Sequence, residues 1–219
     1  MRTGLIIAID GPSGAGKGTV ARAVADRLRY RHIDTGAMYR ALAWKALRDG
    51  IDLSDEAAVS ALAEQVHLEV GDGAVRVDGE DVAAAIRTPE MDAAAAAVAR
   101  LPRVRDRLNA LQRALGRDGG VVMEGRDIGT VVFPDADLKI FLDASPEERA
   151  RRRSLDPLHG ASRGAAITEV ASALEARDRS DRMRAAAPLV RAADAVEIDT
   201  TALSIEGVIE AIMGLIAEG

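Results

Sequence analysis

The sequence predicts an α/β protein in which a parallel β-sheet is flanked by helices, and two observations support this fold class. Short runs of strand length, most of them apolar throughout, alternate with segments of helical periodicity, which is typical of a parallel sheet covered on both faces. Acidic residues directly follow four of these runs, and ligands on such sheets bind at the carboxyl ends of the strands. The expected strands are Leu5–Ile9, Arg31–Ile33, Val121–Met123, Leu138–Leu142 and Ala195–Ile198, and the acidic residues are Asp10, Asp34, Glu124 and Asp143.

Length and composition favour one globular domain over residues 1–219. Hydrophobic residues make up 48% of the chain and charged residues 29%, which is ordinary for a globular protein. The absence of cysteine excludes disulfides and thiolate zinc sites. The first expected strand begins at Leu5, which leaves no room for a signal peptide, and no apolar stretch approaches the ~18 residues that span a bilayer. We therefore expect a cytoplasmic protein without a membrane partner, and nothing in the sequence requires more than a monomer.

Charge is unevenly distributed along the chain. The net charge of −6 argues against a nucleic acid as the main partner. Ten arginines nevertheless lie between Arg149 and Arg191. On composition alone, the simpler interpretation is a solvated helix face. The alternative is a cluster that binds phosphates through paired guanidinium hydrogen bonds.

The segment between the second and third expected strands is too long for a single crossover helix and must contain further structure. Three β-like pieces are separated by the turn sequences Gly71-Asp72-Gly73 and Asp78-Gly79, which predicts a small antiparallel sheet. The following residues are predicted to be helical, with a break near Pro102. The expected strands of this insert are Val66–Val70, Ala74–Val77 and Glu80–Val82, and the expected helical region is Ala83–Leu115.

A glycine-rich loop joins the first strand to the first helix. Residues 10–19 read Asp-Gly-Pro-Ser-Gly-Ala-Gly-Lys-Gly-Thr. Strand, glycine loop, lysine and helix in this order predict a phosphate-binding P-loop, in which backbone N–H groups and the helix N-terminus face the anion and Lys17 reaches the outer phosphates. The hydroxyl stands at Thr19, one residue later than in the common pattern, because Gly18 follows the lysine. The alternative is a glycine-rich turn without a ligand.

Two further strand ends carry residue types suited to nucleotide binding. After the second strand, Thr35 can cap a helix, with Tyr39 and Arg40 about one turn further on. After the third strand, residues 124–129 read Glu-Gly-Arg-Asp-Ile-Gly, and a carboxylate such as Glu124 at a strand end commonly orients water on magnesium. The alternatives are an ordinary N-cap with a surface arginine, and a turn with a surface ion pair.

A third group lies near the C-terminal part of the chain. Arg177, Asp181 and Arg184 stand at i, i+4 and i+7, on one face of a predicted helix. Taken alone, an exposed Arg–Asp pair of this kind is only a weak surface contact. Taken with the P-loop and the strand-end groups, it supplies a second anion site, and the combination predicts phosphoryl transfer between two nucleotides.

The chain resembles the cytidylate kinase family of nucleoside monophosphate kinases, which phosphorylate CMP and dCMP from ATP. The glycine loop alone is shared with many kinases, whereas the run after the third strand and the insert before it are more specific, and the resemblance covers nearly the whole chain. The segments that carry it are Gly11–Thr19, Asp34–Arg40, Ile86–Glu90, Pro102–Arg105, Gly125–Asp135 and Arg177–Leu189.

The resemblance implies a P-loop kinase domain with a monophosphate-binding insert at 62–92 and a lid at 149–164. It implies ATP as donor, Mg²⁺ as cofactor and CMP or dCMP as acceptor. The donor would be bound by Gly11, Ser13, Gly14, Ala15, Gly16, Lys17, Gly18 and Thr19. Magnesium would be held through water by Thr19, Asp34 and Glu124. The acceptor phosphate would be bound by Arg40, Arg126 and Arg184 near Ser13, the base by Thr35, Arg105 and Asp127 with Tyr39 in support, and the sugar by Arg177 and Asp181.

The catalytic groups implied by the resemblance are Lys17, Arg126, Arg184 and, from the lid, Arg153; Arg149 and Arg152 are alternatives to Arg153. Two positions depart from the family pattern. A sugar-contacting serine of some members falls on Ala96, and Ser180 replaces a charged residue of some relatives. The first departure leaves the preference between ribose and deoxyribose open.

Three other functions remain as alternatives. A related P-loop kinase could act on UMP, AMP or a small metabolite. A GTP-dependent switch is disfavoured because guanine-reading folds of this type usually carry Asn-Lys-x-Asp, and the only asparagine, Asn109, precedes alanine. An RNA-binding protein would use the arginine-rich C-terminal half and bind RNA in a salt-sensitive way, without nucleotide turnover.

Overall fold

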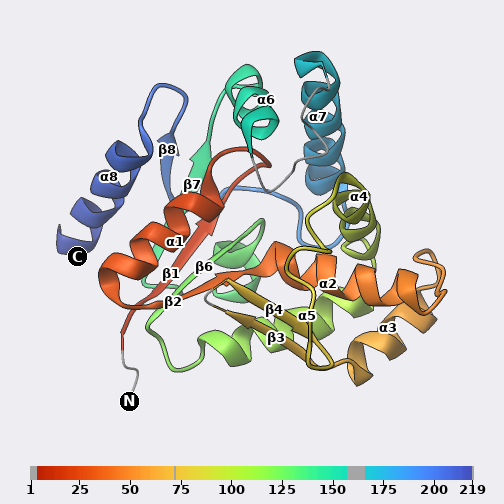
Figure 1. Ribbon diagram of the computed structural model, residues 1–219. Coiled ribbons are helices and arrows are strands. Elements are labelled where there is room, and N and C mark those ends of the chain that lie inside the picture. Colours follow the sequence, from red (N-terminus) through yellow and green to blue (C-terminus); the bar gives the residue numbers. More distant parts are fainter. Residues whose placement is uncertain (1–3, 72, 157–165, 219) are drawn as a thin grey trace.

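The computed structural model describes residues 4–71, 73–156 and 166–218, and its centre is a five-stranded parallel sheet (Figure 1). The strand order is β2-β6-β1-β7-β8, so the predicted parallel sheet is confirmed. Each strand matches an expected one within two residues at either end. The strands are β1 (Ile6–Asp10), β2 (Arg31–Asp34), β6 (Val121–Gly125), β7 (Leu138–Asp143) and β8 (Val196–Asp199).

The sequences of β1 and β6 do not alternate between apolar and polar residues, and their burial gives the reason. Every residue of β1 and β6 is buried, because helices cover both faces of the sheet. Parallel pairing also fixes the level at which the strands end. Asp10 pairs with Gly125, and Asp34 pairs with Glu124, so the carboxyl ends of β1, β2 and β6 lie at one edge of the sheet. The polar residues that follow these strands are therefore brought together.

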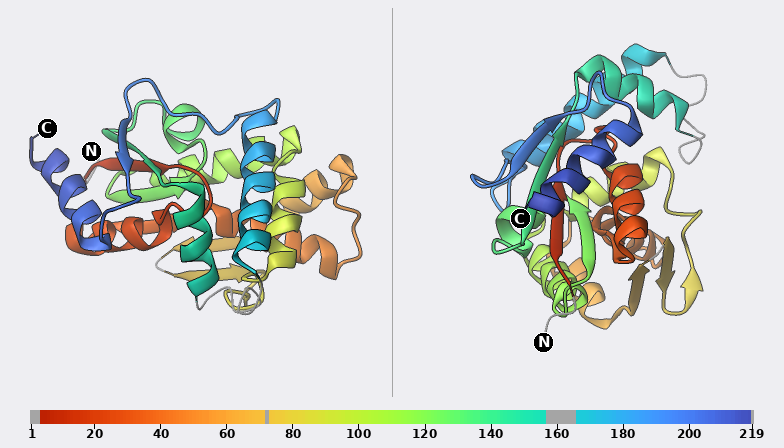
Figure 2. Two further views of the ribbon diagram at one scale, coloured as in Figure 1. Left: turned by 90° about the horizontal axis from the view of Figure 1, so that it is seen from above. Right: turned by 90° about the vertical axis from the view of Figure 1, so that its left-hand side faces the viewer.

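Helices α1 (Lys17–Leu28) and α8 (Ile205–Glu218) pack side by side on one face of the sheet (Figures 1 and 2). Their apolar residues, Val20 and Val24 in α1 and Ile212 in α8, form one core with Ile7 and Ile9 of β1. On the other face, the core includes Met123 and residues of a short π-helical segment, η1 (Ile128–Val132). The sheet is thus held between two apolar layers.

The long segment between β2 and β6 contains helices and a separate antiparallel sheet. The small sheet has the order β3-β4-β5 and confirms the predicted three-stranded insert. A second core lies under it, built around buried residues such as Leu42, Ile86 and Leu108. The elements of this segment are α2 (Thr35–Arg48), α3 (Glu56–Gln65), β3 (Leu68–Gly71), β4 (Ala74–Val77), β5 (Glu80–Asp81), α4 (Pro89–Val98) and α5 (Pro102–Gly116).

One helical prediction is wrong in its first part. Residues 83–86 form turns, and α4 begins only at Pro89 with the Thr88 side chain accepting a hydrogen bond from the Met91 amide. Proline disfavours helical geometry at the residue before it and is well suited to the first helical position. The predicted break near Pro102 is confirmed, since α5 begins there.

Helices α6 (Pro146–Leu155) and α7 (Ile167–Met183) lie against each other above the carboxyl edge of the sheet (Figures 1 and 2). The predicted lid at 149–164 includes the second half of α6, and its residues 157–164 lie outside the described part of the chain. Within the described ranges, none of the helices has the length and apolar character needed to cross a membrane.

Candidate active site

The glycine loop between β1 and α1 has the shape that its sequence predicts. Gly11, Gly14 and Gly16 all have positive φ angles. A Cβ added to Gly11 would lie 2.0 Å from the Leu142 carbonyl oxygen, and one on Gly14 would lie 2.9 Å from the Arg149 Cβ atom. The loop therefore requires glycine both for its backbone conformation and for its close contact with neighbouring segments.

Lys17 begins α1 and is buried. Its Nζ atom donates a hydrogen bond to the Pro12 carbonyl oxygen at 2.7 Å. Burial, and then the positive charge of Arg126, lowers the pKa of Lys17 to about 7. Burial disfavours the charged form of Lys17, and a phosphate beside Nζ would favour it again. The position is therefore suited to binding an anion.

Asp10, at the end of β1, acts on the loop that follows β6. Its carboxylate accepts hydrogen bonds from the amides of Ile128 at 2.9 Å and Gly129 at 2.7 Å. Burial raises the pKa of Asp10 to about 6, although these two amides oppose the shift. The contacts hold the start of η1 in place and so position the adjacent Asp127.

Glu124 and Asp34 are paired in register at the carboxyl edge of the sheet, and the Glu124 carboxylate lies near the first turn of α1. Glu124 Oε1 lies 3.0 Å from His32 Nε2, and a Cβ on Gly18 would lie 3.2 Å from the same oxygen. The Asp34 carboxylate accepts from the Ala37 amide and pairs with Arg40 at 2.9 Å. Burial opposes ionisation of Asp34, but Arg40 and the Ala37 amide overcome it and hold its pKa below the usual range.

The donor set at this edge fits magnesium. The carboxylates of Glu124 and Asp34 and the exposed hydroxyl of Thr19 are hard oxygen ligands, which Mg²⁺ prefers. Among the described residues, there is no cluster of three or more acidic, histidine or cysteine side chains that could enclose a metal ion. This arrangement suits a cation that keeps several waters and takes few direct protein ligands.

The arginines expected to bind the acceptor phosphate come from separate elements and pair with carboxylates above the carboxyl edge of the sheet. Arg126, just after β6, pairs with Asp181 of α7 at 2.9 Å, and Arg184 lies 3.5 Å from the other oxygen of the same carboxylate. Arg40 pairs with Asp34. Burial opposes ionisation of Asp181, but Arg126, Arg184 and Arg177 hold its pKa below the usual value.

Asp92 of α4 is a second meeting point, and the sequence analysis did not identify it. Its carboxylate pairs with Arg177 at 3.0 Å, with Arg153 of α6, and at 3.8 Å with Arg40. Burial lowers the pKa of both Arg177 and Arg153, and Asp92 opposes this effect. This carboxylate links the insert to α6 and α7.

The residues expected to read the base form a buried polar group. Arg105 of α5 is 2% exposed and pairs with Asp127. The Arg105 guanidinium lies over the Tyr39 ring, 5.6 Å from its centroid, and the Thr35 hydroxyl donates to the Glu124 carbonyl oxygen at 2.7 Å. Burial raises the pKa of Tyr39 to about 12, so this phenol stays neutral.

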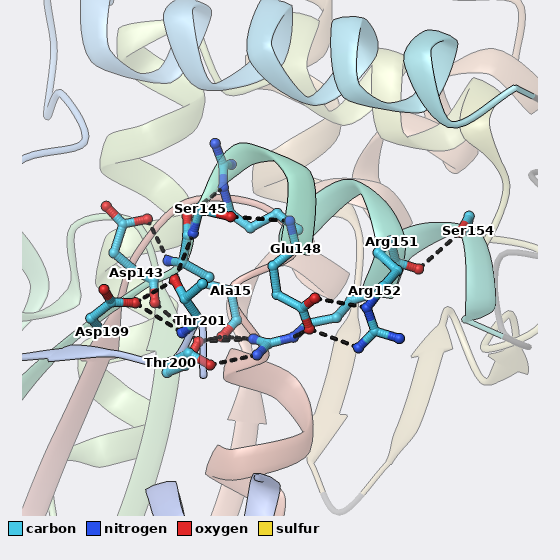
Figure 3. Close-up of polar contacts among 12 residues, drawn as sticks. Ala15, Asp143, Ser145, Glu148, Arg151, Arg152, Ser154, Asp199, Thr200 and Thr201 are labelled. Atoms are coloured by element: carbon cyan, nitrogen blue, oxygen red, sulfur yellow. Dashed lines mark hydrogen bonds and ion pairs between the residues drawn. The ribbon is translucent and has the colours of Figure 1, made fainter. Parts of the chain in front are cut away.

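The three arginines near the start of the predicted lid have different surroundings. Arg153 points to Asp92 and the cleft. Arg152 turns toward the glycine loop and the segment after β8, where its guanidinium meets Thr200 (Figure 3). Arg149 is buried against Asp178 and the carbonyl oxygen of Ser13. Of the three, only Arg153 shares its carboxylate partner, Asp92, with arginines expected to bind the acceptor nucleotide, namely Arg40 and Arg177.

The structure thus brings most of the predicted site residues to one edge of the sheet, with one change in local structure. Helix α7 ends at Met183, so Arg184 is extended rather than helical, yet it still reaches Asp181. Of the two departures from the family pattern, Ser180 accepts hydrogen bonds from Arg100 at 3.1 and 2.8 Å, and Ala96 lies in α4. Residues that sequence reasoning did not place in the site are His32, Asp92, Asp178 and Thr200.

Comparison with known proteins gives a consistent result. The sequence profile described as cytidylate kinase matches residues 7–218. A cytidylate kinase of Desulfitobacterium hafniense is 50% identical over 98% of this chain and 94% of its own length, and one of Pelotomaculum thermopropionicum is 52% identical over 97% and 96%. A crystal structure of shikimate kinase from Bacteroides thetaiotaomicron aligns with a TM-score of 0.53 over 97% of this chain and 98% of that chain, and at 14% identity the likeness concerns the fold alone.

Proposed function

Because the chain belongs to the cytidylate kinase family, we propose that the two charged groups of its cleft bind a donor and an acceptor nucleotide. The protein is a nucleoside monophosphate kinase that transfers a phosphoryl group from ATP to CMP or dCMP. One observation carries the assignment of roles. Asp10, directly before the glycine loop, pairs in register with Gly125, directly before Arg126, so the loop and an arginine of the second group leave the sheet side by side.

The donor site is the glycine loop with the first turn of α1. Backbone amides from Gly14 to Thr19 and the start of the helix would face the phosphates of ATP. Lys17 would leave the Pro12 carbonyl and reach the outer phosphates. Arg153, released from Asp92, would approach the transferred group from α6.

Magnesium would be held by the phosphates and, mainly through water, by Thr19, Asp34 and Glu124. When bound, it would neutralise charge on the donor phosphates and help to orient them. The hydrogen bond from His32 to Glu124 would then fix the direction of this carboxylate.

The acceptor site is formed by α2, α5, α7 and the segment after β6. Arg40, Arg126 and Arg184 would bind the CMP phosphate near Ser13, since guanidinium groups match phosphate oxygens in pairs. Base recognition would come from Thr35, Arg105 and Asp127, with Tyr39 packed under Arg105, and sugar contacts from Arg177 and Asp181.

The chemistry follows from placing two phosphates in line. An oxygen of the acceptor phosphate forms a bond to the γ-phosphorus, and the bond from that phosphorus to the bridging oxygen of ADP breaks. The acceptor oxygen is already ionised, so this step requires no general base. Positioning by the loop and charge stabilisation by Lys17, Arg126, Arg184 and Arg153 supply the acceleration.

We assign closure of the cleft to the insert at 62–92 and to the lid at 149–164. Closure would exclude water, which otherwise competes with CMP for the γ-phosphoryl group. As the sequence leads us to expect, we also propose that the enzyme acts as a monomer in the cytoplasm.

An acceptor panel tests the proposed function. ADP release is measured with ATP, Mg²⁺ and each of CMP, dCMP, UMP and AMP. We expect CMP and dCMP to give the highest kcat/KM, and chelation of the metal to abolish turnover. A higher kcat/KM with UMP, AMP or a small metabolite would show that the assignment of Thr35, Arg105 and Asp127 to cytosine is wrong.

A further inference from the structure

A loop that turns its amides toward a phosphate must satisfy its carbonyl groups on the opposite side. Buried carbonyl oxygens without donors are costly, and the loop lies between β1, α6 and α7. The structure supplies a donor for four of the five consecutive carbonyls from Pro12 to Gly16. Pro12 accepts from Lys17, Ser13 from Arg149, Ala15 from Thr200, and Gly16 from the Val20 amide. Two of these donors are side chains from outside the loop and its helix.

Arg149 joins three segments at the outer side of the loop. Its Nε atom donates to the Ala144 carbonyl at 3.2 Å, after β7, and its Nη1 atom donates to the Ser13 carbonyl at 3.0 Å and to Asp178. The Ser13 amide donates to the other oxygen of Asp178 at 3.1 Å. Both polar groups of Ser13 are therefore held by the Arg149–Asp178 pair.

This pair is buried deeply and fits the loop tightly. Arg149 is 6% exposed and Asp178 is 1% exposed, so solvent does not replace either group. The backbone of α6 at Arg149 also stands where any side chain on Gly14 would go. A rigid guanidinium with several donors can meet these acceptors together, whereas a lysine at the same place has the charge without the planar fork.

Arg152 makes a second, parallel contact one turn further along α6 (Figure 3). Its Nη atoms donate to the hydroxyl and the carbonyl of Thr200 at 2.8 and 2.6 Å, and Nη1 lies 3.5 Å from the Ala15 carbonyl. The hydroxyl of Thr200, a residue that is 1% exposed, lies 3.3 Å from the Ala15 carbonyl oxygen and 3.0 Å from the Asp143 carbonyl oxygen, and its one proton is shared between these two acceptors. Glu148 holds Arg152 from the other side at 2.8 Å.

We propose that the Arg149–Asp178 pair, with Arg152 and Thr200, positions the phosphate-binding loop by holding the carbonyls of Ser13 and Ala15 away from the anion site. These side chains are positioning residues, since they act through the loop and not on the transferred phosphate. The inference rests on the proposed role of the loop as the donor site. Helix α6 would then have two roles. Arg149, near its N-terminus, positions the loop, and Arg153, near its C-terminus, approaches the transferred phosphate.

The test measures binding of inorganic tripolyphosphate, which reports on the loop without a base or sugar. The variants are Arg149→Lys and Asp178→Asn, with Thr200→Val for the second contact. Arg151→Lys is the matched control, because the Arg151 side chain also lies on α6 but is 56% exposed and pairs with Glu148 rather than with the loop. Thermal unfolding midpoints are recorded for all proteins.

We expect Arg149→Lys and Asp178→Asn each to weaken tripolyphosphate binding by about tenfold and to lower kcat/KM for ATP by up to about a hundredfold, the size of effect that a small misplacement produces. The double variant should lose little more than either single variant, because the two side chains act as one unit. Arg151→Lys should bind like the wild type. Thr200→Val should weaken binding less than Arg149→Lys, because one of two donors to Ala15 is kept.

Two results would overturn the inference. One is a lower unfolding midpoint with unchanged tripolyphosphate binding at a temperature where the variants are folded, which would make the pair a stabilising contact only. The other is an additive loss in the double variant. If the wild-type enzyme itself fails to bind tripolyphosphate while turning over ATP, the proposed role of the loop fails first, so the two failures are distinguishable.

Discussion

Binding of ATP is expected to draw a proton onto Lys17. Burial and the charge of Arg126 lower the pKa of this lysine to about 7. At pH 8, about nine-tenths of the Lys17 side chains are then neutral, and at pH 6 about one-tenth are. Phosphate groups beside Nζ would raise the pKa back toward its ordinary value, because an adjacent opposite charge favours the charged form.

The magnitude follows from this shift. Proton uptake through Lys17 should approach about 0.9 per ATP bound at pH 8 and fall to about 0.1 at pH 6. The sign is fixed by the direction of the shift: a group that must be protonated for binding weakens the affinity as pH rises above its pKa in the free enzyme. Above pH 7, the contribution of Lys17 to ATP affinity should decrease by up to about tenfold per pH unit.

Titration calorimetry in buffers of different ionisation enthalpy measures the number of protons taken up. The comparison is between the wild type and Lys17→Arg, whose guanidinium stays charged over the whole range. Protons exchanged by ATP itself, and by Asp10 with its pKa of about 6, occur in both proteins and cancel in the difference. Equal uptake by both proteins at pH 8 would mean that Lys17 is already charged in the free enzyme, and the argument from its burial would be refuted.

Three other substitutions test separate parts of the cleft. Arg126→Ala should raise the Kd of CMP at least about tenfold while changing the Kd of ATP much less, since a charge-assisted pair to phosphate is lost; equal losses for both ligands by calorimetry would place Arg126 with the donor. Asp127→Ala should lower the ratio of kcat/KM for CMP to that for UMP by about tenfold or more, since the buried partner of Arg105 is removed; an unchanged ratio would remove Asp127 from base recognition. Asp92→Asn should lower the unfolding midpoint of the free enzyme and increase the rise in that midpoint on adding CMP or ATP, because Arg177 and Arg153 would lose their shared carboxylate; a smaller rise than in the wild type would show that Asp92 orients these arginines for the substrates instead.

Features set by neighbouring residues could be predicted from the sequence. Buried strands such as Val121–Gly125 are recognisable because both faces are apolar, and the glycine loop is recognisable because its backbone tolerates few other residues. The turn signals at Gly71 and Asp78 likewise predicted the antiparallel insert. Alanine propensity alone predicts helix from Ala83, whereas the Thr88-Pro89 start signal sets the observed beginning of α4.

Partners far apart in the chain could not be predicted in the same way. Asp178 is 165 residues from Ser13, and its role depends on how α7 packs over the sheet edge. Asp92 is one of many acidic residues on predicted helices, and only the folded chain shows that three arginines converge on it. Arg149 and Arg153 belong to one arginine-rich run and lie about one helical turn apart. Arg149 nevertheless contacts the glycine loop, whereas Arg153 pairs with Asp92.

The ion pairs of the cleft explain how an enzyme can hold several buried arginines before its substrates arrive. A buried guanidinium without a partner is costly, so each must be neutralised in the free enzyme. Each of these arginines is neutralised by an aspartate: Arg40 by Asp34, Arg126 by Asp181 and Arg177 by Asp92. Under the roles proposed above, phosphate oxygens would replace carboxylate oxygens when a nucleotide binds, so much of the gain in ionic contact would be offset by the pairs that are given up. Under these roles phosphate binding alone is a weak basis for choosing among nucleotides, and the choice of acceptor would depend on the base contacts proposed for Arg105 and Asp127.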